Sequence, residues 1–410
     1  MQRFFILSLF YFSSFILSAQ HTLKDYVQSA VANSPLIIDN FNQQRSLAYD
    51  SMLIRAALRP QVNLTSNDLY APVINGYGYD EIITNGGNYN ALLGVNYLVT
   101  GRKNLNNQFS LLNIQGQLLE FNRKLTEREL IQNVSVQYIA VYGSQQLLAN
   151  SEKILGILQE ENIILKGVTE KGRYQQTEYL TFLVGLRQQQ LAYEHQKLQM
   201  QSDLFTLNYL CGIVDTATVV LADPEISLSQ NMHVDQTFPF QQFRLDSLQF
   251  QFSVEQIKFR YSPKLNLLGD AGYNTTFLYH AERNFGASVG LSLTVPIYNG
   301  HQRQLQESKI VLSQNTLQSK SAFFIRQFNA KQLALNNQLS QTEQLITEAQ
   351  EQLKLSEGLL KANNKLLEMG DTRIFDYMQS LRNFISAQAT VQQLITNRML
   401  LINQLNYLNH

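Results

Sequence analysis

Asn208-Tyr209-Leu210 ends an interval of 36 residues that begins at Gly172, and Asn406-Tyr407-Leu408 ends an interval of the same length that begins at Gly370. The two intervals are therefore related by a single offset of 198 residues. Self-similarity at a fixed offset indicates a repeated structural unit. We therefore predict that two copies of one unit, each about 200 residues long, make up most of the chain.

Further matched pairs lie inside and upstream of these intervals. They are Thr177-Glu178-Tyr179-Leu180 with Phe375-Asp376-Tyr377-Met378, Arg59-Pro60-Gln61-Val62-Asn63-Leu64 with Ser262-Pro263-Lys264-Leu265-Asn266-Leu267, and Gly101 with Gly300. The offsets of the last two pairs are 203 and 199 residues, a drift that fits a loop of different length between them. The predicted domains are a first repeat over residues 20–210, an equatorial linker over residues 211–239 and a second repeat over residues 240–410.

Long stretches without proline predict very long helices. Residues 73–223 and 297–410 contain none of the seven prolines, which break helices. Residues 104–168 and 302–369 within them are therefore predicted to form helices of about 65 residues, roughly 100 Å long. Apolar residues recur at helical spacing in the first of these helices, in the row Val134, Val141, Leu148 and Leu155 and the adjacent row Leu147 and Ile154.

Shorter helical segments complete each repeat. Residues 23–58 and 240–260 lead into the strands, and residues 173–210 return from the first long helix. One return helix and one lead-in helix together span roughly 60 residues, about the length of one long helix. The sequence therefore predicts a wall of matched height, with Gly172 and Gly370 in turns at the end farthest from the strands.

The segments before the long helices alternate with period two, which predicts β-strands. The alternating apolar residues are Ala287, Val289, Leu291, Leu293, Val295 and Ile297 in the second repeat and Ala91, Leu93, Val95, Tyr97 and Val99 in the first. With partner strands at residues 61–70 and 264–279, they predict β-hairpins at about residues 60–100 and 263–299. Each run of about eleven residues fits a tilted membrane strand with lipid on one side and water on the other. A soluble sheet of two hairpins is the alternative that alternation leaves open.

The first 19 residues have the pattern of a signal peptide. Arg3 precedes an apolar stretch from Phe4 to Leu17, and the small residues Ser18 and Ala19 follow it. An N-terminal membrane anchor is the alternative, although this stretch is short for a membrane-spanning helix. Beyond it, no apolar run approaches the about 20 residues that such a helix needs, so any span would have to use strands closed into a barrel.

The composition gives no sign of nucleic-acid binding or of bond chemistry. The chain has 32 basic and 32 acidic residues, so no net field attracts nucleic acid. Its one cysteine, Cys211, is expected to be a small buried residue rather than part of a disulfide or metal site. The histidines have no metal-ligand spacing, and no phosphate-binding glycine loop is present. We therefore predict no cofactor, no metal site and no enzymatic activity.

The sequence resembles the outer-membrane efflux protein family, TolC and its relatives, over essentially all of the chain after residue 19. The resemblance is carried by Thr22-Leu23-Lys24-Asp25-Tyr26-Val27 through Asn33-Ser34-Pro35, by Pro60 and Pro263 at the strand starts, by Val295-Pro296-Ile297-Tyr298-Asn299-Gly300, and by the duplicated glycine turns. It implies a mainly α fold with membrane β-structure. Three copies would form an α-helical tunnel in the periplasm and, with four strands per chain, a twelve-stranded barrel in the Gram-negative outer membrane.

The resemblance also implies a function without catalysis. Such a homotrimer is the exit duct of a tripartite efflux or type I secretion system, in contact with outer-membrane lipid. It passively conducts substrates delivered by an inner-membrane pump and a periplasmic adaptor, or membrane fusion, protein. The alternative is a periplasmic coiled-coil adaptor or structural scaffold whose strands belong to soluble domains.

In this family, acidic residues just after the second glycine turn constrict the periplasmic aperture. Asp376 falls on the first of those positions, but the second is Gln379, so the resemblance implies one ring of three carboxylates. Glu178 is the counterpart in the first repeat, and the second repeat is expected to carry the gate. Candidate ion-pair residues are Arg173, Arg373 and Arg382. The alternative is that Asp376 and Glu178 are ordinary solvated helix residues.

Overall fold

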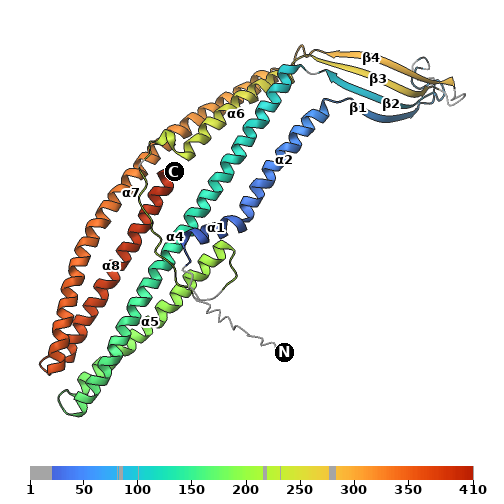
Figure 1. Cartoon of the computed structure of the whole chain (residues 1–410). Coiled ribbons are helices and arrows are strands. Elements are labelled where there is room, and N and C mark those ends of the chain that lie inside the picture. Colours follow the sequence, from blue (N-terminus) through green and yellow to red (C-terminus); the bar gives the residue numbers. More distant parts are fainter. Residues whose placement is uncertain are drawn as a thin grey trace, which may run out of the picture. The chain divides into compact units, whose positions relative to one another are not determined.

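The computed structural model describes residues 21–80, 82, 86–99, 101–215, 219–230, 232–276 and 283–409. The predicted signal peptide, residues 1–19, lies outside this part of the chain. The elements are α1 (Leu23–Asn33), α2 (Pro35–Ala57), β1 (Gln61–Tyr70), β2 (Gly87–Val99), α4 (Arg102–Glu170), α5 (Gln176–Cys211), η1 (Val234–Gln236), α6 (Phe238–Arg260), β3 (Lys264–Thr275), β4 (Phe285–Thr294), α7 (Gln302–Met369) and α8 (Ile374–Asn409) (Figure 1).

The chain divides into two compact units, and each takes residues from both predicted repeats. Unit 1 contains the described residues up to Ser34 together with Glu127–Asn231 and Lys331–Asn409. Unit 2 contains Pro35–Thr126 and Met232–Ala330. The long helices α4 and α7 have residues in both units.

The helix lengths repeat closely between the two halves of the sequence. α4 has 69 residues and α7 has 68, while α5 and α8 have 36 residues each. The predicted long helices and their shorter return helices are therefore present. Among the described residues, none of the helices is both long enough and apolar enough to cross a bilayer.

The predicted lead-in helix over residues 23–58 is wrong as one continuous element. It is divided into α1 and α2 at Ser34, whose backbone is extended with ψ 116°. The reason is Pro35, because a proline disfavours the helical conformation of the residue before it. α1 begins at a well-formed cap, in which the Thr22 backbone N–H donates to Asp25 Oδ2 at 2.9 Å.

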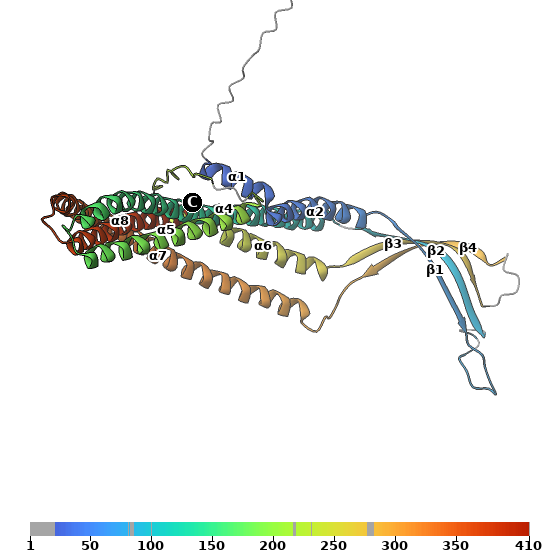
Figure 2. The ribbon, with the colours of Figure 1, turned by 90° about the horizontal axis from the view of Figure 1, so that it is seen from below.

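Unit 2 contains one antiparallel sheet (Figure 2), with the strands in the order β1-β2-β3-β4 (Figure 1). Both predicted hairpins are thus present, and β2 pairs with β3 to join them into a single sheet. One predicted strand end is too long. β4 stops at Thr294 rather than Ile297, because Pro296 has no N–H to donate to a ladder. β3 stops at Thr275, and the predicted continuation at residues 277–279 lies outside the described residues.

Unit 1 is held together by three clusters of buried apolar side chains. One contains Leu207 and Cys211 of α5 with Val134, Tyr138 and Val141 of α4, and α1 packs on it. Burial raises the pKa of the Cys211 thiol to about 11, and the residue acts as an apolar core side chain. A second joins the C-terminal part of α8 to α7, and the third lies at the α4–α5 and α7–α8 turns.

Candidate functional site

The two glycine turns have the same backbone geometry. Gly172 and Gly370 have φ of +78° and +80°, in the left-handed region that favours glycine. After α4, Gly172 N–H donates to Thr169 O at 2.8 Å and Arg173 N–H to Val168 O at 3.2 Å. The same pattern follows α7, with Gly370 bonded to Leu367 O and Asp371 to Leu366 O. Both helices therefore end in a Schellman motif, which satisfies their last carbonyl groups.

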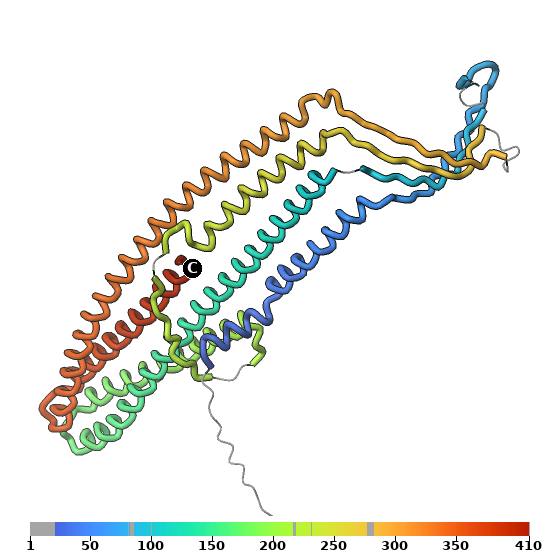
Figure 3. Tube along the Cα trace, turned by 45° about the horizontal axis from the view of Figure 1, so that its top comes forward, coloured from blue at the N-terminus to red at the C-terminus, as the bar shows by residue number. Residues whose placement is uncertain are grey.

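The two turns lie side by side at one end of unit 1 (Figures 1 and 3). The Tyr174 hydroxyl, just after the first turn, lies 2.9 Å from Leu367 O and 3.2 Å from Thr372 O of the second hairpin. Buried apolar side chains from all four helices pack beneath this contact; they include Ile154, Leu158, Phe182, Leu367, Ile374 and Tyr377. We call this cluster, with the two turns, the tip core.

The predicted aperture residue Asp376 forms an ion pair within its own helix. Arg373 Nε lies 2.9 Å from Asp376 Oδ2, and Arg373 Nη2 lies 3.2 Å from Asp376 Oδ1. This bidentate pair is at the N-terminus of α8, where the helix dipole also favours a carboxylate. Hydrogen bonding to Asp376 raises the pKa of Arg373 above its usual range. Both side chains are solvent-exposed in the single chain.

The other predicted aperture residues make local contacts. Glu178 caps α5, because Gln175 N–H donates to Glu178 Oε2 at 3.2 Å. Arg382 donates to Gln379 Oε1 at 3.2 Å. Arg173 lies against the second turn: a Cβ on Gly370 would be 3.7 Å from Arg173 Cδ. Among the described residues, Arg373 with Asp376 is the one ion pair between acidic and basic candidates, and the charge of Glu178 also acts on Arg373. The aperture role of all of them stays a prediction.

Two residues were not among the site residues predicted from the sequence: Tyr174, which belongs to the tip core, and Glu161, which lies near it. Glu161 belongs to the same heptad row as Leu147 and Ile154, seven residues after the latter. A carboxylate in that apolar row is a signal that the side chain is buried. In the structure, Glu161 is only 7% exposed, and burial is the main reason that its pKa is raised.

The register of the sheet aligns apolar residues across all four strands. The aligned sets are Val62, Val95, Gly269 and Val289; Leu64, Leu93, Ala271 and Ala287; Tyr97, Leu267 and Leu291; and Val99, Leu265 and Leu293. Side chains in one such set point to the same face, so one face of the sheet is apolar. This apolar face is exposed: Val289 retains 84% of its accessible surface.

The opposite face of the sheet is more polar, although Leu92, Leu98 and Leu268 also lie on it. One aligned set contains Asn63, Gly94, Asp270 and Ser288, and another contains Leu98, Asn266 and Ser292. The Ser288 hydroxyl donates to Asp270 Oδ2 at 2.7 Å across neighbouring strands. The two faces of the sheet therefore differ in polarity.

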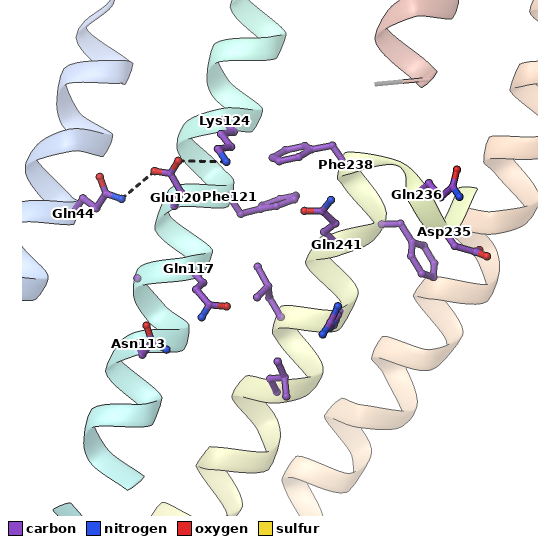
Figure 4. A pocket seen from close by; sticks show the side chains of 15 residues that line it. Gln44, Asn113, Gln117, Glu120, Phe121, Lys124, Asp235, Gln236, Phe238 and Gln241 are labelled. Atoms are coloured by element: carbon purple, nitrogen blue, oxygen red, sulfur yellow. Dashed lines mark hydrogen bonds and ion pairs between the residues drawn. The ribbon is translucent and has the colours of Figure 1, made fainter. Parts of the chain in front are cut away.

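One cavity in unit 2 lies between α4 and α6 (Figure 4). Its volume is about 850 Å³, and the rings of Phe121 and Phe238 in its lining stack on each other with their centroids 4.5 Å apart. Glu120 accepts hydrogen bonds from Arg123 and Gln44, and the bond from Arg123 lowers the pKa of Glu120 to about 2. No group of three or more His, Cys, Asp or Glu side chains in the described part of the chain is placed to hold a metal ion.

A four-stranded sheet with an apolar and a polar face, joined to two helical hairpins of matched length, is the fold of a TolC-like channel protomer. The chain shares this fold with CusC, at TM-score 0.75 and 13% identity over 95% of this chain and 92% of that one. It also matches the outer membrane protein VceC from Vibrio cholerae, at TM-score 0.74 and 12% identity over 94% and 96% of the two chains. A third match is the MtrE outer membrane channel from Neisseria gonorrhoeae in its open state, at TM-score 0.74 and 13% identity over 94% and 88%.

No protein-family model matches the sequence, and no curated protein matches it. The structural matches nevertheless cover nearly the whole of each chain. They confirm the predicted TolC-like fold.

Proposed function

We propose that the chain is one protomer of a homotrimeric exit duct in the Gram-negative outer membrane. The trimer passively conducts substrates outward from a periplasmic adaptor and an inner-membrane pump, as part of a tripartite efflux or type I secretion system. The exposed apolar face of the sheet is the observation that carries the proposal. Soluble proteins rarely leave so large an apolar surface uncovered, whereas lipid would cover it.

The strand order supports assembly from several chains. In the described structure β1 and β4 are the outer strands, and each has one edge that pairs with no other strand. Backbone groups on such edges must be paired within a bilayer, so the sheet has to be closed into a barrel. Four strands cannot close a barrel on their own. Three copies would supply twelve strands, with β4 of one copy beside β1 of the next.

The long helix α7 supports the same conclusion. Exposed apolar side chains recur on it at the a and d positions of a heptad repeat; they are Leu345, Leu355, Leu359, Leu366 and Met369. We call this set the α7 seam. A heptad seam packs against a second helix. The seam is uncovered in the single chain, and a neighbouring copy in a trimer would cover it.

The fold similarity supports the membrane location and the duct role, since the matched structures include an outer membrane protein and outer membrane channels. In the proposed duct, the tip core lies at the periplasmic end, and Asp376 of three copies forms an acidic ring. The proposed duct performs no bond chemistry. The polar face of the sheet would line its water-filled lumen.

The proposal is tested by membrane fractionation, heat-modifiable gel migration and conductance in planar bilayers. A duct is expected in the outer-membrane fraction, as a heat-dissociable trimer that forms ion-conducting channels. A soluble periplasmic monomer that gives no channels would overturn the proposal and favour the adaptor or scaffold alternative.

A further inference from the structure

Glu161 of α4 is the one acidic residue among the buried side chains of the described structure. Its neighbour Glu160 is exposed. The Glu161 Oε2 atom is shielded from solvent and has no hydrogen-bond partner. Asn364 of α7 presents a second buried oxygen, Oδ1, that also has no partner. Both residues belong to unit 1, near the tip core.

These two residues contact each other, so the unpartnered atoms belong to one cluster. A side-chain hydrogen bond from Asn364 acts on the Glu161 carboxylate. Asn364 Nδ2 also donates to Glu368 Oε1 at 3.4 Å. One amide group thus lies between two carboxyl groups, and its own oxygen has no donor to bind.

The surroundings of Glu161 disfavour a negative charge. Burial is the main reason that the pKa of Glu161 is raised, and the like charge of Glu368 on α7 raises this pKa further. The hydrogen bond from Asn364 lowers the pKa, and the like charge of Glu160 adds a smaller increase. From α8, the buried Tyr377 faces Glu161 and is itself shifted to a higher pKa by burial and by that carboxylate. From α5, the Tyr179 hydroxyl donates to Asn162, next to Glu161.

A proton on Glu161 would remove its like-charge repulsion with Glu368 and supply a donor for the unpartnered Asn364 Oδ1 of the same cluster. If Glu161 is protonated, its O–H can donate to Asn364 Oδ1 while Asn364 Nδ2 donates to Glu368. Rotating the amide by half a turn is no substitute, because Glu368 would then lose its donor. If Glu161 is ionised, its buried carboxylate faces the like charge of Glu368 and its Oε2 atom accepts no hydrogen bond, so the Asn364 hydrogen bond only partly offsets the loss of hydration.

We propose that Glu161 and Asn364 form a proton-operated clasp between α4 and α7 that holds the two helical hairpins together beside their turns. The clasp is closed when Glu161 is protonated and loosens when the proton is lost. This inference deepens the proposed function, because the tip core would be the periplasmic end of the duct and the clasp would regulate its opening. Only the effect on conduction rests on the proposed function.

The direction of the pH effect follows from the raised pKa. The folded chain binds the Glu161 proton more tightly than the unfolded chain does. The stabilisation is therefore complete below the ordinary glutamate pKa and is lost as pH rises through the higher pKa of the folded state. Acidification should tighten the tip core, and alkalinisation should loosen it.

The first test measures backbone exchange in the detergent-solubilised full chain. Hydrogen–deuterium exchange is followed in peptides around Glu161 and Asn364 between about pH 5 and about pH 8, after correction for intrinsic exchange rates. In the wild type, protection of these peptides should fall as pH rises, by about tenfold or more. Protection that is independent of pH after correction would overturn the proposal without the use of any variant.

The variant test uses E161Q, with E160Q as its matched control. The amide introduced by E161Q is neutral at every pH and can still donate to Asn364 Oδ1, so protection in this variant should stay at the wild-type low-pH level. E160Q removes a charge from the exposed neighbour that contributes only the smallest part of the raised Glu161 pKa, so it should keep the pH dependence with its midpoint moved slightly to lower pH. A pH dependence that survives unchanged in E161Q would overturn the clasp.

Channel recordings then connect the clasp to the duct. In planar bilayers, wild-type conductance should rise with pH, while E161Q should keep the low-pH conductance throughout. If wild-type and E161Q conductance change equally with pH, the clasp does not regulate opening. If no channels form under any condition, the proposed function fails, and the exchange measurements still decide whether the clasp exists.

Discussion

The two helical hairpins repeat the same geometry but reverse the burial of one equivalent pair. Glu161 on α4 and Leu359 on α7 are 198 residues apart, the offset that relates the two glycine turns. Yet the charged residue is only 7% exposed, while the leucine is 49% exposed. Polarity alone would give the opposite order. The face of α4 that carries Glu161 is therefore internal to the chain, and the equivalent face of α7 is available to another chain.

Glu178 and Asp376 form a second equivalent pair. Each contacts the residue three positions before it, but through different atoms. Three residues before Glu178 stands Gln175, and three residues before Asp376 stands Arg373. In the first hairpin the Glu178 carboxylate accepts a hydrogen bond from the Gln175 backbone N–H and only caps α5. In the second hairpin the Asp376 carboxylate forms an ion pair with the Arg373 guanidinium group. The second hairpin thus has an ion pair that another chain could break, and the first does not.

The hairpins are most alike at the ends opposite to the turns. Asn208 on α5 and Asn406 on α8 occupy equivalent positions, and both donate from Nδ2 to a carbonyl group of the segment between α5 and α6. The acceptors are Asp215 O and Ser227 O, and both distances are 2.8 Å. This shared end supports the fold, while the differences are concentrated near the turns. That contrast can be tested by substituting equivalent residues in the two hairpins.

The largest effect is expected where the hairpins are alike. Leu207 and Leu405 are equivalent, and both are fully buried. L207A and L405A should each lower the free energy of unfolding by about 2–5 kcal/mol, the usual range for a buried leucine reduced to alanine. Chemical denaturation of the solubilised protein measures both. Values that differ by more than about 2 kcal/mol would show that the two ends are not energetically equivalent.

The next effect is expected at the α7 seam. L359E places a carboxylate at a position that is exposed in one chain and covered in the proposed trimer. We expect it to lower the trimer fraction in heat-modifiable gels by about tenfold or more, because burying an unpaired charge is costly. L312E, at an exposed position on the same helix but in unit 2, is the comparison variant. A trimer that tolerates L359E fully would remove the seam from the interface.

The local structure of the two hairpins could be predicted from the sequence, whereas the contacts of Glu161 could not. The turn glycines, the helix lengths and the strand alternation are local patterns, and each is present in the structure. The contacts of Glu161 depend on Asn364 and Glu368, some 200 residues away, so local periodicity indicated burial but not a partner. The pairing of Arg373 with Asp376 could be predicted from the sequence, because residues three apart on a helix are neighbours.

A smaller effect is expected at the hydroxyl group that joins the two turns. Y174F removes the hydrogen bond to Leu367 O while keeping the buried ring. It should lower the free energy of unfolding by about 1 kcal/mol. Y179F, which removes the bond to Asn162 within the first hairpin, is the matched control. If the tip core depends on the hydrogen bond between the hairpins, Y174F should increase backbone hydrogen exchange in the second turn, and Y179F should not.

The smallest effect on stability, and the sharpest on conduction, is expected from the charged pair that distinguishes the hairpins. Because Asp376 and Arg373 are exposed in the single chain, D376N should leave the denaturation midpoint almost unchanged. In the proposed trimer it would remove three carboxylates from the aperture, so block of single-channel current by divalent cations should weaken. E178Q removes the equivalent charge of the first hairpin and should leave the block as in the wild type. Equal block in the wild type and in D376N would show that Asp376 does not line the aperture. Weaker block in both variants would mean that the two hairpins contribute equally to the aperture, contrary to the expectation that the second carries the gate.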